Sequence, residues 1–533
     1  MSPGPTESSR DSPETHDSAG ELPPCHADQP LGRRMLAASF PHRTERVELL
    51  ETHISWVILT GDWAYKLKKP VRFDFLDYST ATLREKYCRR ELETNRVWAP
   101  DIYVDVVPIF ELGEGGLRVG DAGQEPGDGE AVIDHAVRMR QFPQSALLAE
   151  QLARGAVTPG DMETLAGELA DLHSRIEAVP YRNDLVSGGS TRPAIENCDY
   201  LVDHLAADDP DRGRAERMKV WTREAIDRLE PTMESRANAG AVRKCHGDLH
   251  LGNVLFLNGR FVPFDGIEFN DSFSQVEGLD EVAFLAMELS EHGYVGHSRR
   301  LLNRYVEATG DYGGLPLLRY FLAYRAMVRA KVDLIRQTQT HGGDQAALSD
   351  DGRRYLDYAL RVTAPRPAEL WITYGLSGSG KSTASTRVVE DRGVFRLRSD
   401  VLRKRLAGRD PLEKTPPDQL ASLYSSQMTA RTYDRMLELA DRILAAGWGV
   451  IVDATFLKAS QRRPFADLAA SHRAAFRILV CEADRDELLR RIEARGTDPS
   501  DASASVVAAQ IEHAQPPGGD EQRFVIHASR LDE

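Results

Sequence analysis

Two stretches decide the fold of this 533-residue chain: HGDLHLGN, His246 to Asn253, and GLSGSGKS, Gly375 to Ser382. The first stretch places an aspartate and an asparagine in a loop between short apolar runs. The second is a glycine-rich loop that ends in a lysine and a serine. The two loops are unrelated in design and far apart in the sequence, so we expect two separate sites.

Length and composition are typical of a soluble protein with several domains. At roughly 150 residues per domain, the chain is long enough for about three structural units. Hydrophobic residues make up 41% of the chain and charged residues 28%, which is ordinary for a globular protein. The sequence has no apolar run near the roughly 18 residues of a membrane span and no signal pattern at its start. We therefore expect a cytoplasmic protein with no membrane partner.

Cysteine content and net charge narrow the class further. The five cysteines are scattered without metal-ligand spacing, as in reduced intracellular thiols. The 67 basic and 82 acidic side chains give a net charge of −15. This charge disfavours a broad nucleic-acid surface but leaves a local basic patch open, above all in the C-terminal part. The sequence leaves the oligomeric state open.

Shifts in composition divide the chain into five segments. Residues 1–34 are too poor in apolar side chains to fold and are predicted to form a disordered tail. Residues 35–142 hold short strand-like runs and one helix, residues 143–345 are mostly helical, and residues 346–368 form a helix and a linker. Residues 369–533 alternate strands and helices, which predicts a parallel sheet covered by helices.

The first stretch has the residue types that phosphoryl transfer needs: a base for the acceptor hydroxyl and oxygen ligands for Mg²⁺. Asp248 can take the acceptor's proton, and Asn253 can offer its amide oxygen to the metal. Asp265 follows the next strand and can offer a carboxylate. An Asp-x4-Asn loop, a hairpin and a further Asp is the order of a catalytic loop and a metal-binding strand.

A lysine and a glutamate upstream can complete this site. Lys66 lies in the middle of a predicted strand, from which it could reach the nucleotide phosphates, and Glu91 on the next helix could hold it by an ion pair. In the alternative interpretation both are solvated surface charges. Lys68 and Lys69 are rival lysines, and Glu93 is a rival carboxylate. The catalytic loop favours the pair of Lys66 and Glu91.

The second stretch follows an apolar strand and precedes a helical run, which is the context of a phosphate-binding loop. A flexible Gly/Ser linker is the alternative. Lys381 would reach the β and γ phosphates of ATP, and the hydroxyl of Ser382 would bind Mg²⁺. The predicted cofactor-binding residues of this loop are Gly375, Ser377, Gly378, Ser379, Gly380, Lys381, Ser382 and Thr383.

Carboxylates and arginines farther along can serve the same site. Asp400 ends an apolar strand and would act as the base, and it could at the same time be the N-cap of the next helix. Asp453 ends another strand and would hold metal-bound water. Arg490, Arg491 and Arg495 form either a lid that closes on the phosphoryl group, with Arg491 and Arg495 as the ATP contacts, or a solvated helix face.

Residues 45–340 resemble the aminoglycoside phosphotransferase-like kinases, a small-molecule branch of the protein-kinase fold, because the loop His246–Asn253 matches that family's signature. Residues 165–173 resemble the helix that precedes this loop in the family. KLKKPV, residues 66–71, and YRAMVRAKV, residues 324–332, resemble its bifunctional aminoglycoside phosphotransferase/ATP-binding subgroup. The resemblance implies two lobes, ATP in the cleft, a hinge near residues 139–141 and small-molecule hydroxyl acceptors.

The chain departs from this family at two places. It has no G-x-G-x-x-G between the first strands, so residues 51–55 would have to cover the phosphates. Where the subgroup tends to have two aspartates after the metal-binding strand, the chain has Glu277 and Glu281.

Residues 370–510 resemble the small P-loop kinases, which include polynucleotide kinase, gluconate kinase and the zeta-toxin type, and AAA-type ATP-binding domains. Arg398-Ser399-Asp400 matches the acceptor-side aspartate of these kinases, and Asp453 and Arg462 match the segment that follows.

The sequence therefore predicts an α/β multidomain protein, with a two-lobed kinase-like part and a P-loop NTPase domain. We expect an ATP- and Mg²⁺-dependent kinase with two sites, in which Asp248 and Asp400 are the bases. One alternative is that one domain regulates the other, as an NTP-driven switch or a ligand-binding pseudokinase. Another is a nucleic-acid end kinase.

Overall fold

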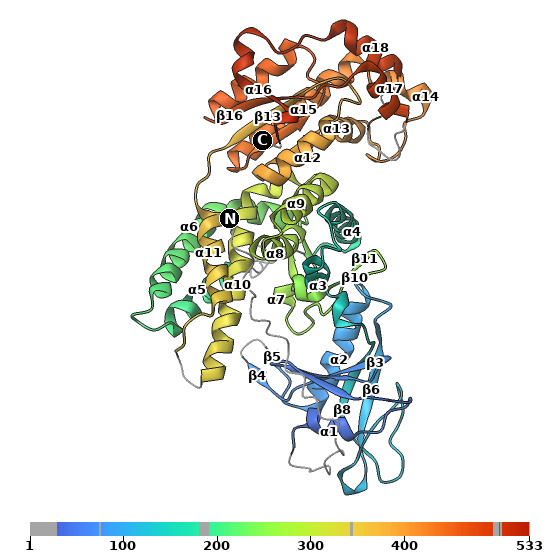
Figure 1. Cartoon of the computed structure of the whole chain (residues 1–533). Coiled ribbons are helices and arrows are strands. Elements are labelled where there is room, and N and C mark those ends of the chain that lie inside the picture. The colour runs from blue at the N-terminus through green and yellow to red at the C-terminus, as the bar shows by residue number, and fades with distance from the viewer. Residues whose placement is uncertain are drawn as a thin grey trace, which may run out of the picture. The chain divides into compact units, whose positions relative to one another are not determined.

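The structure, a computed structural model, describes residues 29–73, 76–180, 191–341, 345–493, 500 and 504–531 (Figure 1). It divides into two compact units, one of residues 1–157 and 242–276 (unit 1) and one of residues 158–241 and 277–533 (unit 2). Most of the predicted tail lies outside the described residues. Helix α1 (Leu31–Arg34) differs from that prediction, because Leu31 packs against the apolar core of unit 1.

Unit 1 contains a six-stranded antiparallel sheet in the order β1-β2-β3-β8-β6-β7, with helix α2 against it. Its main elements are β1 (Glu48–Glu51), β2 (Ser55–Leu59), β3 (Trp63–Lys68), α2 (Ala81–Arg96), β6 (Tyr103–Glu111), β7 (Leu117–Val119) and β8 (Ala131–Arg140). Smaller elements are η1 (Met35–Ala37), β4 (Arg72–Phe73), β5 (Leu76–Asp77), η2 (Gly113–Gly115), η3 (Gln144–Ala146) and α3 (Leu148–Ala153).

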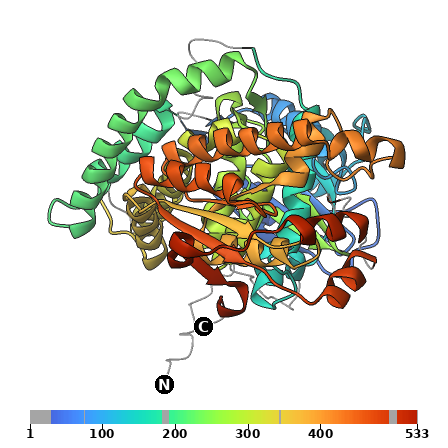
Figure 2. The same ribbon diagram turned by 90° about the horizontal axis from the view of Figure 1, so that it is seen from above.

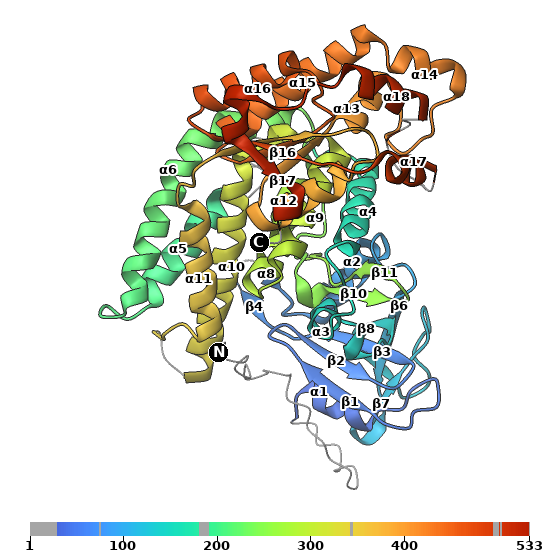
Figure 3. The same ribbon diagram turned by 45° about the horizontal axis from the view of Figure 1, so that its top comes forward.

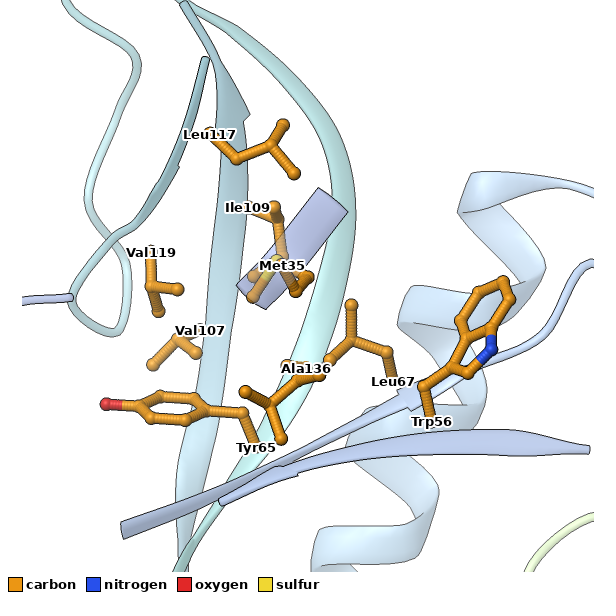
Figure 4. Packing of buried hydrophobic residues seen from close by; sticks show 10 residues of the cluster. Met35, Trp56, Tyr65, Leu67, Val107, Ile109, Leu117, Val119 and Ala136 are labelled. Atoms are coloured by element: carbon orange, nitrogen blue, oxygen red, sulfur yellow. The ribbon is translucent and has the colours of Figure 1, made fainter. Parts of the chain in front are cut away.

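The two faces of this sheet differ because side chains alternate along each strand. On one face, Tyr65 and Leu67 of β3 join Met35, Trp56 and neighbouring residues in an apolar cluster (Figure 4). The other face of β3 carries the two lysines of that strand toward α2. Helix α2 begins after Thr80, whose hydroxyl accepts a hydrogen bond from the Leu83 N–H at 3.2 Å.

The second part of unit 1 contains the loop HGDLHLGN and a β-hairpin. It consists of β9 (Val242–Lys244), the 3-10 turn η5 (Leu251–Asn253), β10 (Val254–Leu257), β11 (Arg260–Pro263) and α7 (Asp271–Ser274). The predicted Asn258-Gly259 turn joins β10 to β11, and both residues have positive φ, 52° and 75°. Such a pair favours the tight turn that matches the twist of a hairpin.

Unit 2 begins with a layer of helices. They are α4 (Asp161–Arg175), α5 (Thr191–His204), α6 (Pro210–Asn238), α8 (Gly278–Glu291), α9 (Val295–Thr309), α10 (Leu315–His341) and α11 (Asp350–Thr363), with the turn η6 (Tyr312–Gly314) before α10. The short strand β12 (Gln275–Glu277) crosses the boundary between the two units. Helix α8 is buried on nearly all sides, as its apolar sequence from Val282 to Leu289 indicates.

The rest of unit 2 is a five-stranded parallel sheet in the order β14-β15-β13-β16-β17, which confirms the predicted doubly covered sheet. Helices α15 and α16 cover one face and α12 the other (Figure 3), and α15 crosses the strands in the view from above (Figure 2). The strands are β13 (Glu369–Tyr374), β14 (Phe395–Arg398), β15 (Val450–Asp453), β16 (Ala475–Val480) and β17 (Val525–His527). The helices are α12 (Lys381–Arg392), α13 (Ser399–Leu406), α14 (Pro417–Leu423), α15 (Ser426–Ala445), α16 (Ala459–Ser471), α17 (Arg485–Glu493) and α18 (Ala504–His513), followed by the turns η7 (Gly519–Phe524) and η8 (Ala528–Arg530).

Among the helices that the structure describes, none combines the length and the apolar character that crossing a membrane requires.

Candidate active sites

In unit 1 the structure brings Lys66 and Glu91 together. The Lys66 Nζ lies 2.8 Å from the Glu91 Oε1, and Lys66 also forms an ion pair with Asp265. Burial opposes the charge on Lys66, but the carboxylates of Asp265 and Glu91 outweigh it and raise the lysine's pKa well above its ordinary value. The predicted lysine is therefore a fixed cation beside the predicted metal ligand.

A second lysine shares the same glutamate. The Lys68 Nζ lies 2.8 Å from the Glu91 Oε2 and pairs with Glu268, and its distance to the Tyr78 hydroxyl is 3.2 Å. Burial of Glu91 opposes its charge, but Lys66 and Lys68 lower its pKa to about 2. Lys68 is thus a structural partner of Glu91, and sequence reasoning had treated it only as a rival of Lys66.

Asp265 is held in an unusual backbone conformation. Its φ is +62°, a region that aspartate tolerates better than most residues. Its N–H donates to the Tyr103 hydroxyl at 3.1 Å, and the next N–H, of Gly266, donates to the Asn95 Oδ1 at 2.7 Å. Asn95 lies one helical turn after Glu91 on α2, so one helix positions both the lysine's partner and the Asp265 backbone. Sequence reasoning missed Asn95, although its spacing of four from Glu91 was a readable signal.

Asp248 and Asn253 lie against each other. The Asn253 Nδ2 donates to the Asp248 backbone oxygen and to its Oδ2, both at 3.0 Å. The His250 Nε2 lies 3.4 Å from the same Oδ2. The Asn253 Oδ1 accepts no hydrogen bond from a residue that the structure describes, so this oxygen is available to a ligand.

Contacts with neighbouring backbone explain why the loop His246–Asn253 has a glycine at position 247 and a histidine at position 246. Gly247 has a φ of +84°, and a Cβ there would lie 2.8 Å from the Phe273 backbone oxygen. The ring of His246 is fully buried, and its Nε2 lies 2.9 Å from the Phe264 backbone oxygen. These contacts attach the loop to the segment that carries Asp265.

The residues at this site fit a hard divalent cation. Asn253 offers an amide oxygen and Asp265 a carboxylate that is 40% exposed, and oxygen donors of this kind are what Mg²⁺ binds.

The two glutamates that stand where the subgroup tends to have aspartates lie in unit 2. Glu277 accepts from Arg236 at 2.7 Å, and Glu281 lies 2.9 Å from the His173 Nε2. Both carboxylates are buried, and burial raises the pKa of Glu277 although Arg236 opposes the rise. Each of them thus has a cationic or hydrogen-bonding partner within unit 2.

The glycine-rich loop of unit 2 joins β13 to α12, as predicted. Gly378 and Gly380 have φ values of +87° and +88°, and a Cβ on Gly375 would lie 2.3 Å from the Cys481 backbone oxygen. A side chain at any of these three positions would strain or displace the loop. The Lys381 Nζ donates to the Leu376 backbone oxygen at 2.7 Å across it.

This loop forms one wall of a cavity of ≈ 340 Å³. The lining residues that the sequence predicted are Ser377, Gly378, Gly380, Lys381, Ser382, Thr383, Asp400, Asp453 and Arg491. Gly375 and Ser379, which the sequence also predicted, are not among the lining residues, and the Gly375 N–H donates to the Thr455 backbone oxygen at 3.2 Å. Asp453 is buried at the end of β15 and accepts from the Ser385 hydroxyl at 3.1 Å.

The other wall of this cavity carries the acceptor-side candidates. Asp400 lies in the first turn of α13, which begins at Ser399 after the N-cap Arg398, so Asp400 is not the N-cap itself. Arg403, one turn later on the same helix face, lies 4.9 Å from the centre of the Tyr424 ring and donates to the Thr429 hydroxyl at 3.2 Å. Sequence reasoning missed Arg403 and Tyr424.

Arg490, Arg491 and Arg495 were predicted to form a lid or a solvated helix face, and the structure does not place them alike. Arg491 donates to the Gly378 backbone oxygen at 3.4 Å and lines the cavity. Arg490 is exposed and pairs with Glu487 on its own helix, as expected of a solvated face. Arg495 lies outside the described residues. A residue that the prediction lacked, Gln510 of α18, accepts from the Ser377 N–H at 2.9 Å and donates to its hydroxyl at 3.1 Å.

Each half of the chain matches the model of a known protein family. Residues 140–264 match the model of the phosphotransferase enzyme family, and residues 370–517 match that of an AAA domain. The N-terminal part therefore has a protein-kinase-like fold and the C-terminal part a P-loop kinase fold. The chain is a kinase-type phosphotransferase of families that use ATP.

Two relatives align along most of the chain. The uncharacterized protein Rv2004c of Mycobacterium tuberculosis and the uncharacterized protein Mb2027c of Mycobacterium bovis are each 30% identical to it over 469 residues, 87% of this chain and 89% of theirs. The chain belongs to one family with these mycobacterial proteins.

Solved structures resemble the two halves separately. A choline/ethanolamine kinase family protein from Mesorhizobium loti is similar over 62% of this chain and 92% of its own, at 14% identity and a TM-score of 0.36. A gluconokinase from Sinorhizobium meliloti is similar over 31% of this chain and 83% of its own, at 18% identity and a TM-score of 0.23.

Proposed function

We propose that the chain carries two phosphoryl-transfer sites, one in each half, and that each site moves the γ-phosphoryl group of ATP to a hydroxyl of a small molecule. The observation that carries the proposal is the cavity of unit 2, in which the phosphate loop with Lys381 faces the carboxylate of Asp400. A carboxylate that lines the same cavity as the phosphate loop supports a base for an acceptor hydroxyl. The paired Asp248 and Asn253 support the same chemistry in unit 1.

In the first site, Asp248 accepts the proton as the acceptor oxygen forms its bond to the γ-phosphorus and the bond from phosphorus to the β–γ bridging oxygen breaks. The Asn253 side chain donates a hydrogen bond to one oxygen of the Asp248 carboxylate and so holds that carboxylate in place. Lys66, held by Glu91, places its charge on the nucleotide phosphates. Asn253 and Asp265 would hold Mg²⁺, which would neutralise the phosphate charge.

In the second site, Asp400 has the role of the base and Lys381 that of the phosphate cation. Arg491 adds positive charge at the mouth of the loop. Ser382 and Asp453 would hold Mg²⁺, Asp453 through bound water. Arg398 and Arg403 line the acceptor side of the cavity, so an acceptor that carries negative charge is favoured there.

A panel of hydroxyl acceptors incubated with γ-labelled ATP tests the proposal. The variants Asp248→Asn and Asp400→Asn each remove one base and keep its shape, and Asp171→Asn, on an exposed position of α4, is the matched control. We expect each base variant to lose transfer to one set of acceptors and to keep transfer to the other. General-base catalysis contributes about 10²–10⁴-fold, so the loss is large enough to measure.

The outcomes separate the alternatives. If Asp400→Asn leaves transfer to every acceptor at the level of Asp171→Asn, the second half is not a kinase of this kind and a regulatory role remains for it. If transfer to polynucleotide ends is the only activity and falls steeply with added salt, the nucleic-acid end kinase is the better interpretation.

A further inference from the structure

Unit 2 contains a second cavity, of ≈ 290 Å³, apart from the phosphate loop. It is bordered by the helices α8 to α11, by the linker that follows α11 and by the segment between α12 and β14. The phosphate loop precedes the first residue of α12, and Gly393, which lines the second cavity, follows its last residue. The two places are therefore separated by the length of a 12-residue helix, about 18 Å. Helices α9 and α12 lie side by side there (Figures 1 and 3).

Three guanidinium groups line this cavity, and none of its lining residues is acidic. Arg299 of α9 donates to the Glu390 backbone oxygen in the last turn of α12. Arg361 of α11 lies 3.1 Å from a carboxylate oxygen of Glu291. Arg366, in the linker, forms no ion pair or hydrogen bond with any residue that the structure describes. Among the described residues, Arg361 alone of the three has an ion pair, with Glu291, while Asp391 acts on Arg299 without forming one, so the cavity lining keeps an excess of positive charge.

The arginines also repel one another. Burial, together with the charge of Arg366, lowers the pKa of Arg299, and the same two causes act on the neighbouring Arg319. Arg319 stacks on Trp448, 4.3 Å from the ring centre, at the cavity wall. A bound anion would relieve this repulsion.

The rest of the wall is apolar. Leu302, Leu322, Val394, Phe395 and Trp448 supply it, and the hydroxyls of Ser290 and Tyr358 lie among them. The Ser298 hydroxyl also lines the cavity, but it donates to the Ala286 backbone oxygen at 2.6 Å. At about 30 Å³ per water, the volume equals about ten waters, or an organic molecule of roughly ten to fifteen non-hydrogen atoms. A ligand that matches this lining therefore combines an anionic group for the arginines with an apolar body for the other side chains.

We propose that this cavity is a binding site for a small organic phosphomonoester, with its phosphate on Arg299, Arg361 and Arg366 and its body against Phe395 and Trp448. Planar guanidinium groups bind phosphate oxygens in pairs, and the dianion of a phosphomonoester matches the excess charge better than a single carboxylate does. None of its lining residues is among those assigned to either ATP site.

Calorimetric titration of the full chain tests this, with a nonhydrolysable ATP analogue present in excess to fill the ATP sites. The probes are phenyl phosphate, inorganic phosphate and benzoate. We expect phenyl phosphate to bind one site per chain, inorganic phosphate to bind more weakly because it lacks the apolar body, and benzoate to bind more weakly because it carries one charge.

The variants Arg366→Ala and Arg361→Ala/Arg366→Ala should weaken phenyl phosphate binding by about 10- to 100-fold for each arginine removed. Arg354→Ala, on an exposed position of α11, is the control and should bind like the wild type. Arg366 forms no ion pair or hydrogen bond with a described residue, so its removal should not lower the thermal unfolding temperature.

The proposal is overturned if phenyl phosphate shows no saturable binding to the wild-type chain, or if the double variant binds it as tightly as Arg354→Ala does. Equal affinity for benzoate and phenyl phosphate would overturn the assignment to phosphomonoesters.

Discussion

Replacement of Glu91 by glutamine tests how the lysines of unit 1 are held. Glu91 is fully buried and places one carboxylate oxygen 2.8 Å from Lys66 and the other 2.8 Å from Lys68. The substitution keeps the shape of the side chain but leaves two buried ammonium groups with less compensating charge. Loss of one partner of a buried ion pair typically costs about 3–5 kcal/mol.

The pKa of Glu91 gives a second measure of this contribution. Its lowering from 4.5 to about 2 corresponds to roughly 3 kcal/mol of stability at neutral pH. Because the folded-state pKa is the lower one, the contribution is complete above pH 4.5 and is lost as the pH falls toward 2. At about pH 3.5, roughly 1 kcal/mol of it should already be gone.

Hydrogen exchange of residues 63–96, read by mass spectrometry, measures the free energy of local opening in this part of unit 1. We expect Glu91→Gln to lower it by about 3–5 kcal/mol near pH 7, and the gap from the wild type to narrow as the pH falls below 4.5. Glu93→Gln is the control, because Glu93 is exposed on the same helix. Equal opening energies for the two variants would refute this account of the ion pairs.

Three further substitutions test other parts of the account. Gly375→Ala places a Cβ 2.3 Å from the Cys481 backbone oxygen, so the phosphate loop must shift, and calorimetry should show ATP affinity at that site falling at least about tenfold. Arg403→Lys keeps the charge but loses the guanidinium contacts, and steady-state kinetics should show a KM for the second acceptor about tenfold higher with the KM for ATP unchanged. Asn95→Leu leaves the buried Gly266 N–H without its acceptor and should lower the free energy of unfolding in urea by about 1–3 kcal/mol.

Each of these three predictions would be contradicted by a specific observation. ATP affinity in Gly375→Ala equal to that of Gly167→Ala, a change in open space on α4, would show that the loop tolerates the added methyl group. If Arg403→Lys changed only the KM for ATP, Arg403 would contact the nucleotide and not the acceptor. Unchanged stability in Asn95→Leu would mean that Asn95 does not hold the Asp265 segment.

The sequence predicted the elements around the first loop but not the way their side chains are shared. A strand at Lys66 and a helix at Glu91 could be read from the pattern of apolar residues. Whether Glu91 or Glu93 faces the sheet depends on the rotation of α2 about its axis, which packing fixes and the local sequence does not. The alternation of side chains in β3 puts Lys66 and Lys68 on one face, so the glutamate that pairs with one lysine pairs with both.

The phosphate loop was readable because its glycines have a local cause: the backbone needs positive φ and close approach at those positions. Gln510 was not readable, because it meets Ser377 from 133 residues away in the sequence. The cavity with three arginines could not be predicted from the sequence for the same reason. Its residues come from helices and a linker that only the tertiary packing brings together, and none of them stands in a motif.

The measurement that tests the central claim most directly is transfer from γ-labelled ATP by the variants Asp248→Asn, Asp400→Asn and the double variant over one acceptor panel. Two independent phosphoryl-transfer sites predict that each single variant keeps the acceptors that the other loses, and that the double variant transfers to none. If one single variant loses all transfer while the other loses none, the chain has one catalytic site and the account is contradicted.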